Sequence, residues 1–143
     1  MILEFPVEPL PKQSAKFYET YWGIRSYQPF NIQKFKNIVR KYALVQRPVG
    51  FKLFDDCIKV DATFYFRPVS SMRKRDIQEI ILGKIFFKKT KPDVDNLTKA
   101  LFDCLNGVIW VDDALVVDYH VRKIFAPDTG KIVMNIESIV DTV

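Results

Sequence analysis

The fold is decided by residues 91–123, KPDVDNLTKALFDCLNGVIWVDDALVVDYHVRK, in which a helical pattern passes directly into a strand pattern. Leucines recur every four residues, which predicts a helix over 94–106 that ends at Gly107. Over 115–122, successive side chains then alternate with period two, which predicts a half-buried strand. Six aspartates lie in or beside these elements, although the formal net charge of the chain is +5.

The same two periods recur on either side of this stretch. They predict an edge strand over 2–8, a helix from an Asn31 N-cap to about Leu44 with Phe30 and Phe35 as a hydrophobic staple, a strand over 58–66, a short helix over 71–82 and a strand over 132–136. Residues 14–29 are ambiguous. The strands over 115–122 and 132–136 flank the turn 127–130, so they are expected to form an antiparallel hairpin.

These elements predict a single α+β domain over 1–143, with a mostly antiparallel or mixed β-sheet and two main helices packed on it. Hydrophobic residues make up 48% of the chain, which excludes a disordered protein. No apolar run approaches the ~20 residues that cross a bilayer, and the first residues lack the pattern of a signal peptide, so we expect no membrane partner and a cytoplasmic location. Cys57 and Cys104 are expected to be buried thiols, in a strand and a helix.

Positive charge gathers ahead of the aspartates. The sequence pI of about 9.2 favours a polyanionic partner such as nucleic acid. The cations that lead into the acidic stretch are Arg73, Lys74, Arg75, Lys84, Lys88, Lys89 and Lys91. The first three of them, Arg73, Lys74 and Arg75, form either a solvated basic loop or fraying helix end, or a set of phosphate contacts.

The aspartates allow a structural and a functional interpretation. Asp93 is placed to cap the helix over 94–106, Asp95 could pair with Lys99 four residues later, and Asp112-Asp113 resembles a turn. Alternatively, a tight fold could bring these carboxylates together around a cation. Carboxylates at close range repel unless a cation lies between them, and hard oxygen ligands suit Mg²⁺ or Mn²⁺. Lys99 would then stabilise charge at a phosphate.

Competing motifs fail at particular positions. An EF-hand would need Asp or Asn at 97 and Gly at 98, where Leu and Thr stand. A haloacid-dehalogenase-like motif would need Thr at position 97. His120, the one histidine, lies in a predicted strand without a partner for a triad. A transferase that holds a metal-nucleotide through D-x-D would be expected to have a Gly-rich phosphate loop, which is missing here.

The motifs K-P-D-x-D-N-L-x-K-A, F-D-x-L-N-G and D-D-A-x-V-V-D-Y, in this order, resemble the signature of RusA-type Holliday junction resolvases, crossover junction endodeoxyribonucleases common in prophages. The resemblance covers residues 91–123, about a quarter of the chain. It implies that Asp93, Asp95 and Asp113 are the essential acids and metal ligands, that Lys99 is the catalytic lysine, and that Asp112 assists the metal site.

The resemblance further implies a Mg²⁺-dependent homodimer that nicks a four-way DNA junction in pairs, in DNA recombination and repair; Mn²⁺ could substitute. Many relatives carry P-x-P-K-x-R-P-R near the N-terminus, whereas Lys12 is followed here by Gln-Ser-Ala-Lys. We expect the seven cations over 73–91 to compensate. Phe86 and Phe87 are core or dimer-interface residues, or a wedge between bases. The alternative function is a branched-DNA-binding protein that does not cut.

Overall fold

The computed structural model describes residues 1–12, 16–27 and 30–139. Its elements, in chain order, are β1 (Ile2–Phe5), β2 (Lys16–Thr20), β3 (Gly23–Tyr27), α1 (Phe30–Gln46), β4 (Ile58–Phe66), α2 (Lys74–Ile81), α3 (Val94–Leu105), the short 3-10 helix η1 (Asp113–Leu115), β5 (Val116–Phe125) and β6 (Lys131–Ser138). None of the described helices is long and apolar enough to span a membrane.

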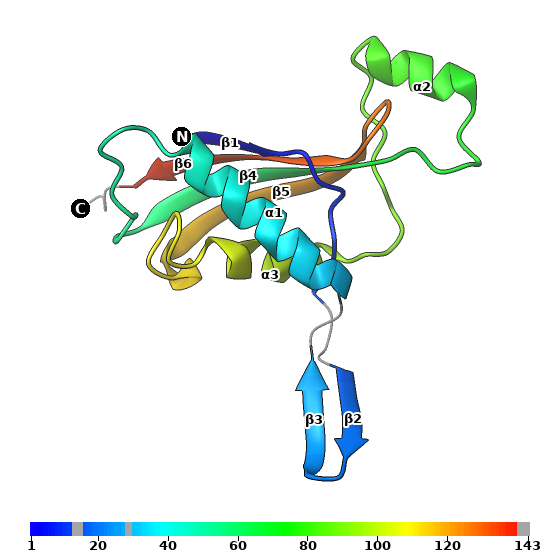
Figure 1. The fold of residues 1–143 in the computed structure, drawn as a ribbon. Helices are drawn as coiled ribbons and strands as arrows, with labels where there is room; N and C mark the ends of the chain where they lie inside the picture. Colours follow the sequence, from blue (N-terminus) through cyan, green and yellow to red (C-terminus); the bar gives the residue numbers. More distant parts are fainter. Residues whose placement is uncertain (13–15, 28–29, 140–143) are drawn as a thin grey trace.

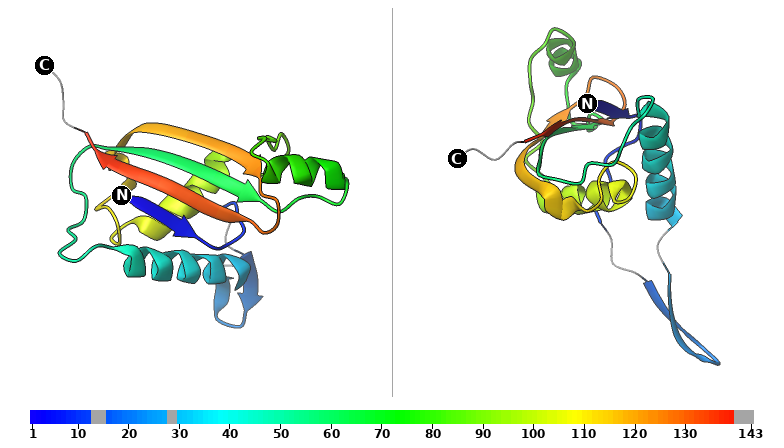
Figure 2. Two further views of the ribbon diagram at one scale, coloured as in Figure 1. Left: turned by 90° about the horizontal axis from the view of Figure 1, so that it is seen from above. Right: turned by 90° about the vertical axis from the view of Figure 1, so that its left-hand side faces the viewer.

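Strands β1, β4, β5 and β6 form one open mixed sheet in the order β1-β6-β4-β5. β4 pairs in parallel with β5 and antiparallel with β6, and β1 pairs antiparallel with β6 at the edge. Helices α1 and α3 cover one face of this sheet (Figures 1 and 2). The predicted α+β class, with a mixed sheet and two packed helices, is confirmed.

The predicted hairpin of the last two strands is wrong, because β4 lies between β5 and β6. Both strands form as expected, but neither pairs with the other. The reason lies in β4: Ile58, Val60 and Ala62 are fully buried, and Thr63 on the opposite face is buried too. A strand with so much buried surface is most stable in the centre of a sheet, where both of its edges are paired.

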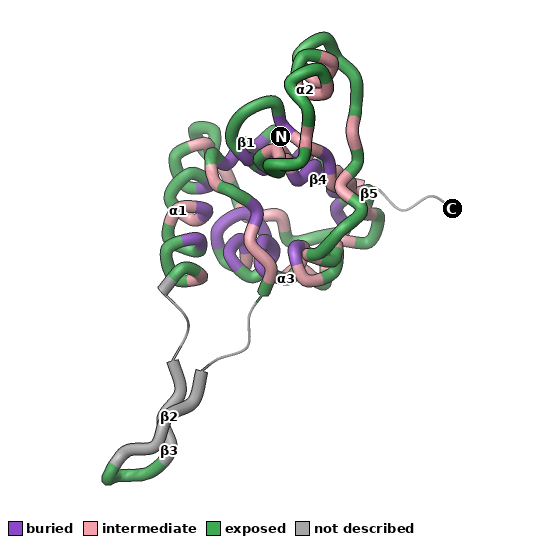
Figure 3. Tube along the Cα trace, turned by 90° about the vertical axis from the view of Figure 1, so that its right-hand side faces the viewer, coloured by how far each residue is buried: buried purple, intermediate pink, exposed green. Residues whose placement is uncertain are grey.

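The core lies between the sheet and the two helices (Figure 3). From α3, Leu97, Leu101 and Leu105 are fully buried, which is the face that the four-residue spacing predicts. Trp110 follows α3 and is fully buried, and its indole Nε1 donates a hydrogen bond to Asn106 Oδ1 at 2.7 Å. This bond satisfies the one polar atom of the ring, so the tryptophan can anchor the loop after α3 inside the core.

Helix α3 spans Val94–Leu105, and Gly107 follows with φ +76°, as the sequence predicts. Helix α1 begins at Phe30, so Asn31 lies inside its first turn instead of at its N-cap. The side chain of Phe30 in the predicted staple lies outside the described residues. Helix α2 is shorter than predicted and has Arg73 at its N-cap, where Asp76 accepts a hydrogen bond from the Arg73 backbone N–H.

The two cysteines differ. Cys104 is buried in α3 as predicted, and burial raises the pKa of its thiol to about 11. It therefore stays protonated at neutral pH. Cys57 is half-buried and precedes β4 by one residue, so its predicted place inside a strand is wrong.

Strands β2 and β3, in a stretch that the sequence left ambiguous, pair antiparallel as a separate two-stranded arm. The arm stands away from the sheet and its helices (Figure 1). At its tip, Tyr21 and Trp22 are exposed to 92% and 81%.

Candidate active site

The outer face of α3 carries a row of polar residues. Asp95, Lys99 and Asp103 follow one another at four-residue intervals, and Asn106 comes three residues later, so all four share one side of the helix. The first three are exposed and Asn106 is half-buried, whereas the opposite side of the helix is buried in the core. The predicted ion pair between Asp95 and Lys99 is not among the ion pairs of the described residues.

Asp93 occupies the N-cap position of α3, but its side chain makes no capping hydrogen bond. Its Oδ2 instead accepts a hydrogen bond from Lys91 Nζ at 2.9 Å, and this contact is the main reason why the pKa of Lys91 is raised. The observed partner of the carboxylate thus lies ahead of the helix in the chain. Capping therefore does not account for an aspartate at this position.

Lys123 of β5 fixes the segment that enters α3. Its Nζ donates hydrogen bonds to the carbonyl oxygens of Thr90 and Pro92, both at 2.8 Å. Burial lowers the pKa of Lys123, and the charges of Lys88 and Lys91 lower it further, while Asp93 opposes them. The N-terminal end of α3 is therefore a mixed cluster of carboxylates and ammonium groups, held against the edge strand of the sheet.

Asp112 and Asp113 lie beyond the other end of α3. Phe54 holds the loop between them and the helix, since its backbone bonds to Ile109 O at 3.0 Å and to Val111 N at 2.9 Å. Burial and the charge of Asp112 raise the pKa of Asp113. A hydrogen bond from Asn106 partly offsets this rise. Asp103 contributes further repulsion.

The predicted carboxylates thus form two groups, one at each end of α3. The helix has 12 residues, so its ends are roughly 18 Å apart at 1.5 Å per residue. Two oxygens that bind one Mg²⁺ at about 2.1 Å lie within ~4 Å of each other. Among the described residues, no three His, Cys, Asp or Glu side chains lie close enough to hold a metal ion. One chain in this arrangement does not assemble the three-carboxylate centre.

Asp103 is an acidic residue of this face that the sequence did not single out as a site residue. Its Oδ2 pairs with Lys12 Nζ at 2.9 Å, and both side chains line a pocket of ≈ 240 Å³ between α1 and α3. The sequence could have indicated Asp103, because it follows Lys99 by four residues and so lies on the same side of the helix.

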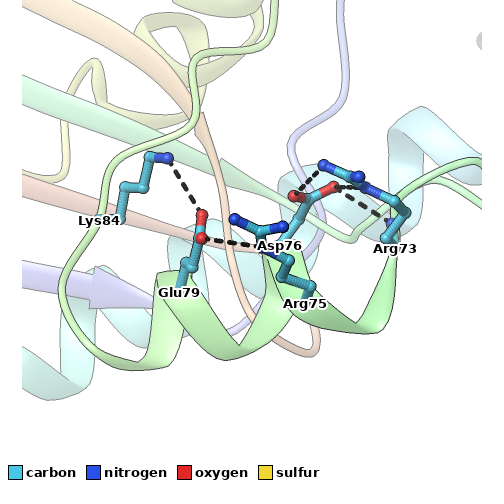
Figure 4. A network of polar contacts seen from close by, with 5 residues as sticks. All are labelled: Arg73, Arg75, Asp76, Glu79 and Lys84. Carbon is cyan, nitrogen blue, oxygen red and sulfur yellow. Dashed lines mark hydrogen bonds and ion pairs between the residues drawn. The ribbon is translucent and has the colours of Figure 1, made fainter.

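Three of the four predicted DNA-binding cations in and beside α2, all except Lys74, are paired with acids (Figure 4). Arg73 pairs with Asp76 at 3.4 Å, while Arg75 and Lys84 both pair with Glu79, at 3.5 and 3.0 Å. These contacts lower the pKa of Glu79, chiefly through the hydrogen bond from Lys84. Asp76 and Glu79 therefore offset two of the four positive charges of residues 73–84.

Of the remaining predicted cations, Lys88 lies in a segment that adds to the edge of the sheet. Residues 86–88 run along β5, where Phe87 bridges Ile124 and Phe86 O accepts from Phe125 N. Lys88 Nζ bonds to Thr90 Oγ1 and lies over two aromatic rings. Lys74 and Lys89 are exposed. Phe87 is 67% exposed and Phe86 is half-buried, and neither belongs to the buried core, so a core role for the pair is wrong.

An open mixed sheet, with acidic residues along the outer face of a covering helix and cations at the N-terminal end of that helix, is suited to phosphate chemistry. Comparison with known families makes this specific. The family described as Endodeoxyribonuclease RusA matches residues 6–137. The chain belongs to this family.

The chain is also similar to individual curated proteins. The chain is 43% identical over 54 residues to "Crossover junction endodeoxyribonuclease RusA" of Escherichia coli O139:H28 (strain E24377A / ETEC), which covers 37% of this chain and 45% of the relative. It is 33% identical over 104 residues to "Uncharacterized protein YqaN" of Bacillus subtilis (strain 168), which covers 70% of each. The match to the E. coli protein thus spans less than half of that relative's length.

Proposed function

We propose that the chain is a Mg²⁺-dependent endodeoxyribonuclease that resolves four-way DNA junctions by paired, symmetric nicks, as a homodimer in the cytoplasm. The family match over residues 6–137 carries this proposal, because the matching family is described as Endodeoxyribonuclease RusA and a relative 43% identical over 54 residues is named a crossover junction endodeoxyribonuclease. The catalytic and metal-binding residues are Asp93, Asp95 and Asp113, with Lys99 as the catalytic lysine and Asp112 as a further metal ligand. Mn²⁺ can replace Mg²⁺.

The separation of the carboxylates bears directly on the dimer. Because Asp93 and Asp95 lie at one end of α3 and Asp113 at the other, a single chain does not fit a shared ion. A twofold dimer presents both ends of two helices, so carboxylates of one protomer can face those of its partner. We propose that each active site draws Asp93 and Asp95 from one protomer and Asp113 from the other.

A four-way junction with each strand end-labelled in turn tests the activity. Incubation with protein and Mg²⁺ should give nicks at symmetric positions in two opposed strands. EDTA and the Asp93→Asn variant should each abolish the nicks while junction binding persists. If all strands stay intact while the junction is bound tightly, the chain is instead a branched-DNA-binding protein that does not cut.

Mixing two inactive variants tests the shared site. Asp93→Asn and Asp113→Asn proteins, each inactive alone, should regain nicking when co-expressed, because the mixed dimer keeps one intact site and one doubly altered site. This single site should cut one strand without its paired partner. If the mixed dimer is as inactive as its parents while the wild type cuts, both groups of carboxylates act within one chain, and the shared site is refuted without affecting the nuclease assignment.

A further inference from the structure

The outer side of helix α1 carries a group of basic residues ahead of its last turn. It carries four cations, Lys34, Lys36, Arg40 and Lys41, and no acidic residue. The three lysines are exposed and Arg40 is half-buried. No ion pair of the described residues joins any of the four to a carboxylate. Their positive potential is therefore not cancelled locally.

These cations belong to a larger basic segment. Residues 9–54 contain nine Lys and Arg and one acid, Glu19. This third of the sequence therefore has a net charge of +8, whereas the whole chain has +5. The remainder of the chain has 13 Lys and Arg and 16 Asp and Glu, so its net charge is −3. The segment includes both the β2–β3 arm and α1.

The basic side of α1 adjoins the acidic face of α3. Lys36 lines the pocket between the two helices together with Asp103. The charges of Lys36 and Arg40 also act on Cys104 of α3, where they oppose the rise in its pKa. A phosphate backbone bound to α1 would thus pass beside the row that contains Lys99.

The dimensions suit a DNA strand. From Lys34 to Lys41 the cations of α1 span about 10 Å along the helix axis, which matches roughly three nucleotides at 3.4 Å each. The helix follows the arm in the chain, and the arm extends from its beginning (Figure 1). DNA lying on α1 can therefore continue towards the tip of the arm.

The tip carries two large rings. Tyr21 and Trp22 meet edge to face, with their centroids 4.9 Å apart and their planes at 88°. Both are exposed to 80% or more, although an isolated two-stranded hairpin buries little apolar surface of its own. Exposed aromatic side chains beside cations are the usual means of binding unpaired bases, because every base offers a face for stacking.

We propose that α1 and the arm tip form one DNA-binding surface, in which the cations of α1 hold the phosphates of one strand and Tyr21 and Trp22 stack on bases opened at the branch point. The proposal rests on the proposed function, since it assumes that the substrate is branched DNA. A second copy of the chain is a poorer occupant, because two basic segments that face each other repel.

Salt dependence tests the helix. Each lysine that contacts a phosphate contributes about −1 to the slope of log K against log [salt]. Lys34→Gln/Lys41→Gln should therefore lower the magnitude of the slope for junction binding by about 2. The matched control is Lys59→Gln/Lys131→Gln, which changes two exposed lysines of the open sheet face and gives the same net charge of +3. The proposal is overturned if both double variants change the slope equally.

Tryptophan emission tests the tip. The chain has two tryptophans, of which Trp110 is fully buried and Trp22 is exposed, so Trp22→Phe identifies the signal of the tip. A four-way junction should quench the emission of Trp22 severalfold more than a linear duplex of equal length. The stacking role fails if a bound junction leaves this emission unchanged, or if it shifts with protein concentration in the absence of DNA, which indicates self-association.

The two proposals fail differently. If the wild-type protein does not bind a junction at all, the proposed function fails together with this surface. If it binds and cuts the junction while the slope and the emission match their controls, only the surface is refuted. Tyr21→Ala/Trp22→Ala should keep duplex binding but lose most of the preference for the junction.

Discussion

Helices α1 and α2 both look basic and amphipathic in sequence, yet they are used differently. In α1, Phe35, Val39 and Ala43 are buried in the core, while the outer cations have no acidic partner. In α2, no residue is buried, and the helix stands at the end of the sheet away from α1 and α3 (Figures 1 and 3). Its arginines are paired with its own acids.

The difference shows that neither the burial of a helix nor its positive potential follows from its amino-acid composition alone. A hydrophobic side on a helix does not guarantee burial, since a helix between two long connections can lie outside the core. A high count of cations does not guarantee a positive surface either, since charges four residues apart cancel when their signs differ. The charge balance within each helix, more than its number of lysines and arginines, indicates where DNA binds.

The largest expected contrast is in stability. Phe35→Ala in α1 should lower the free energy of unfolding by about 3–5 kcal/mol, because the ring is only 3% exposed and its loss leaves a cavity. Ile81→Ala in α2 should change it by no more than about 0.5 kcal/mol, because Ile81 is 64% exposed. Urea unfolding followed by circular dichroism measures both. A cost above 2 kcal/mol at Ile81 would show that α2 is covered in solution.

A second contrast should appear in amide hydrogen exchange. Amides in the middle of α1 should be protected close to the global limit, because opening them requires the core to open. Those of α2 should exchange at least ~100-fold faster, because its opening exposes no buried residue. Exchange at pH 7 with peptide-level mass spectrometry resolves the two helices. Equal protection would contradict the picture of α2 as a helix without tertiary anchors.

Much of the fold follows from local patterns. The limits of α3 were predictable because Asp93 and Gly107 mark its ends and its leucines mark its buried side. The pairing of β5 and β6 was not predictable from alternation, which identifies strands but not their neighbours. The central position of β4 depends on burial of both of its faces, which is a property of the assembled sheet.

The candidate site divides in the same way. The sequence correctly placed Asp95 and Lys99 on one side of a helix, since helical spacing alone decides this. The position of Asp113 depends on the loop after α3, which buried Trp110 and the backbone bonds of Phe54 hold at the C-terminal end. No local pattern reports such an anchor. The three-residue spacing of Arg73 and Asp76 could have predicted their ion pair. Its effect on DNA binding depends on the net charge of the whole segment around α2.

The smallest expected effect comes from making α2 resemble α1. Glu79→Gln removes the acid that pairs with Arg75 and Lys84, and it raises the net charge from +5 to +6. Binding of linear duplex DNA at low salt should strengthen by about threefold, because two cations lose their acidic partner. Glu137→Gln is the matched control, since it gives the same charge on an exposed β6 residue. It should change the affinity less.

The pH dependence of this difference has a definite sign. Because Lys84 and Arg75 lower the pKa of Glu79, its carboxylate stays charged and paired from neutral to weakly acidic pH. The affinity difference between Glu79→Gln and the wild type should therefore be constant from pH 8 to pH 5, and it should disappear as the pH falls through the lowered pKa and Glu79 becomes neutral in the wild type. If Glu79→Gln binds DNA no better than Glu137→Gln at any pH, α2 lies away from the DNA, and the predicted phosphate contacts of Arg75 and Lys84 are excluded.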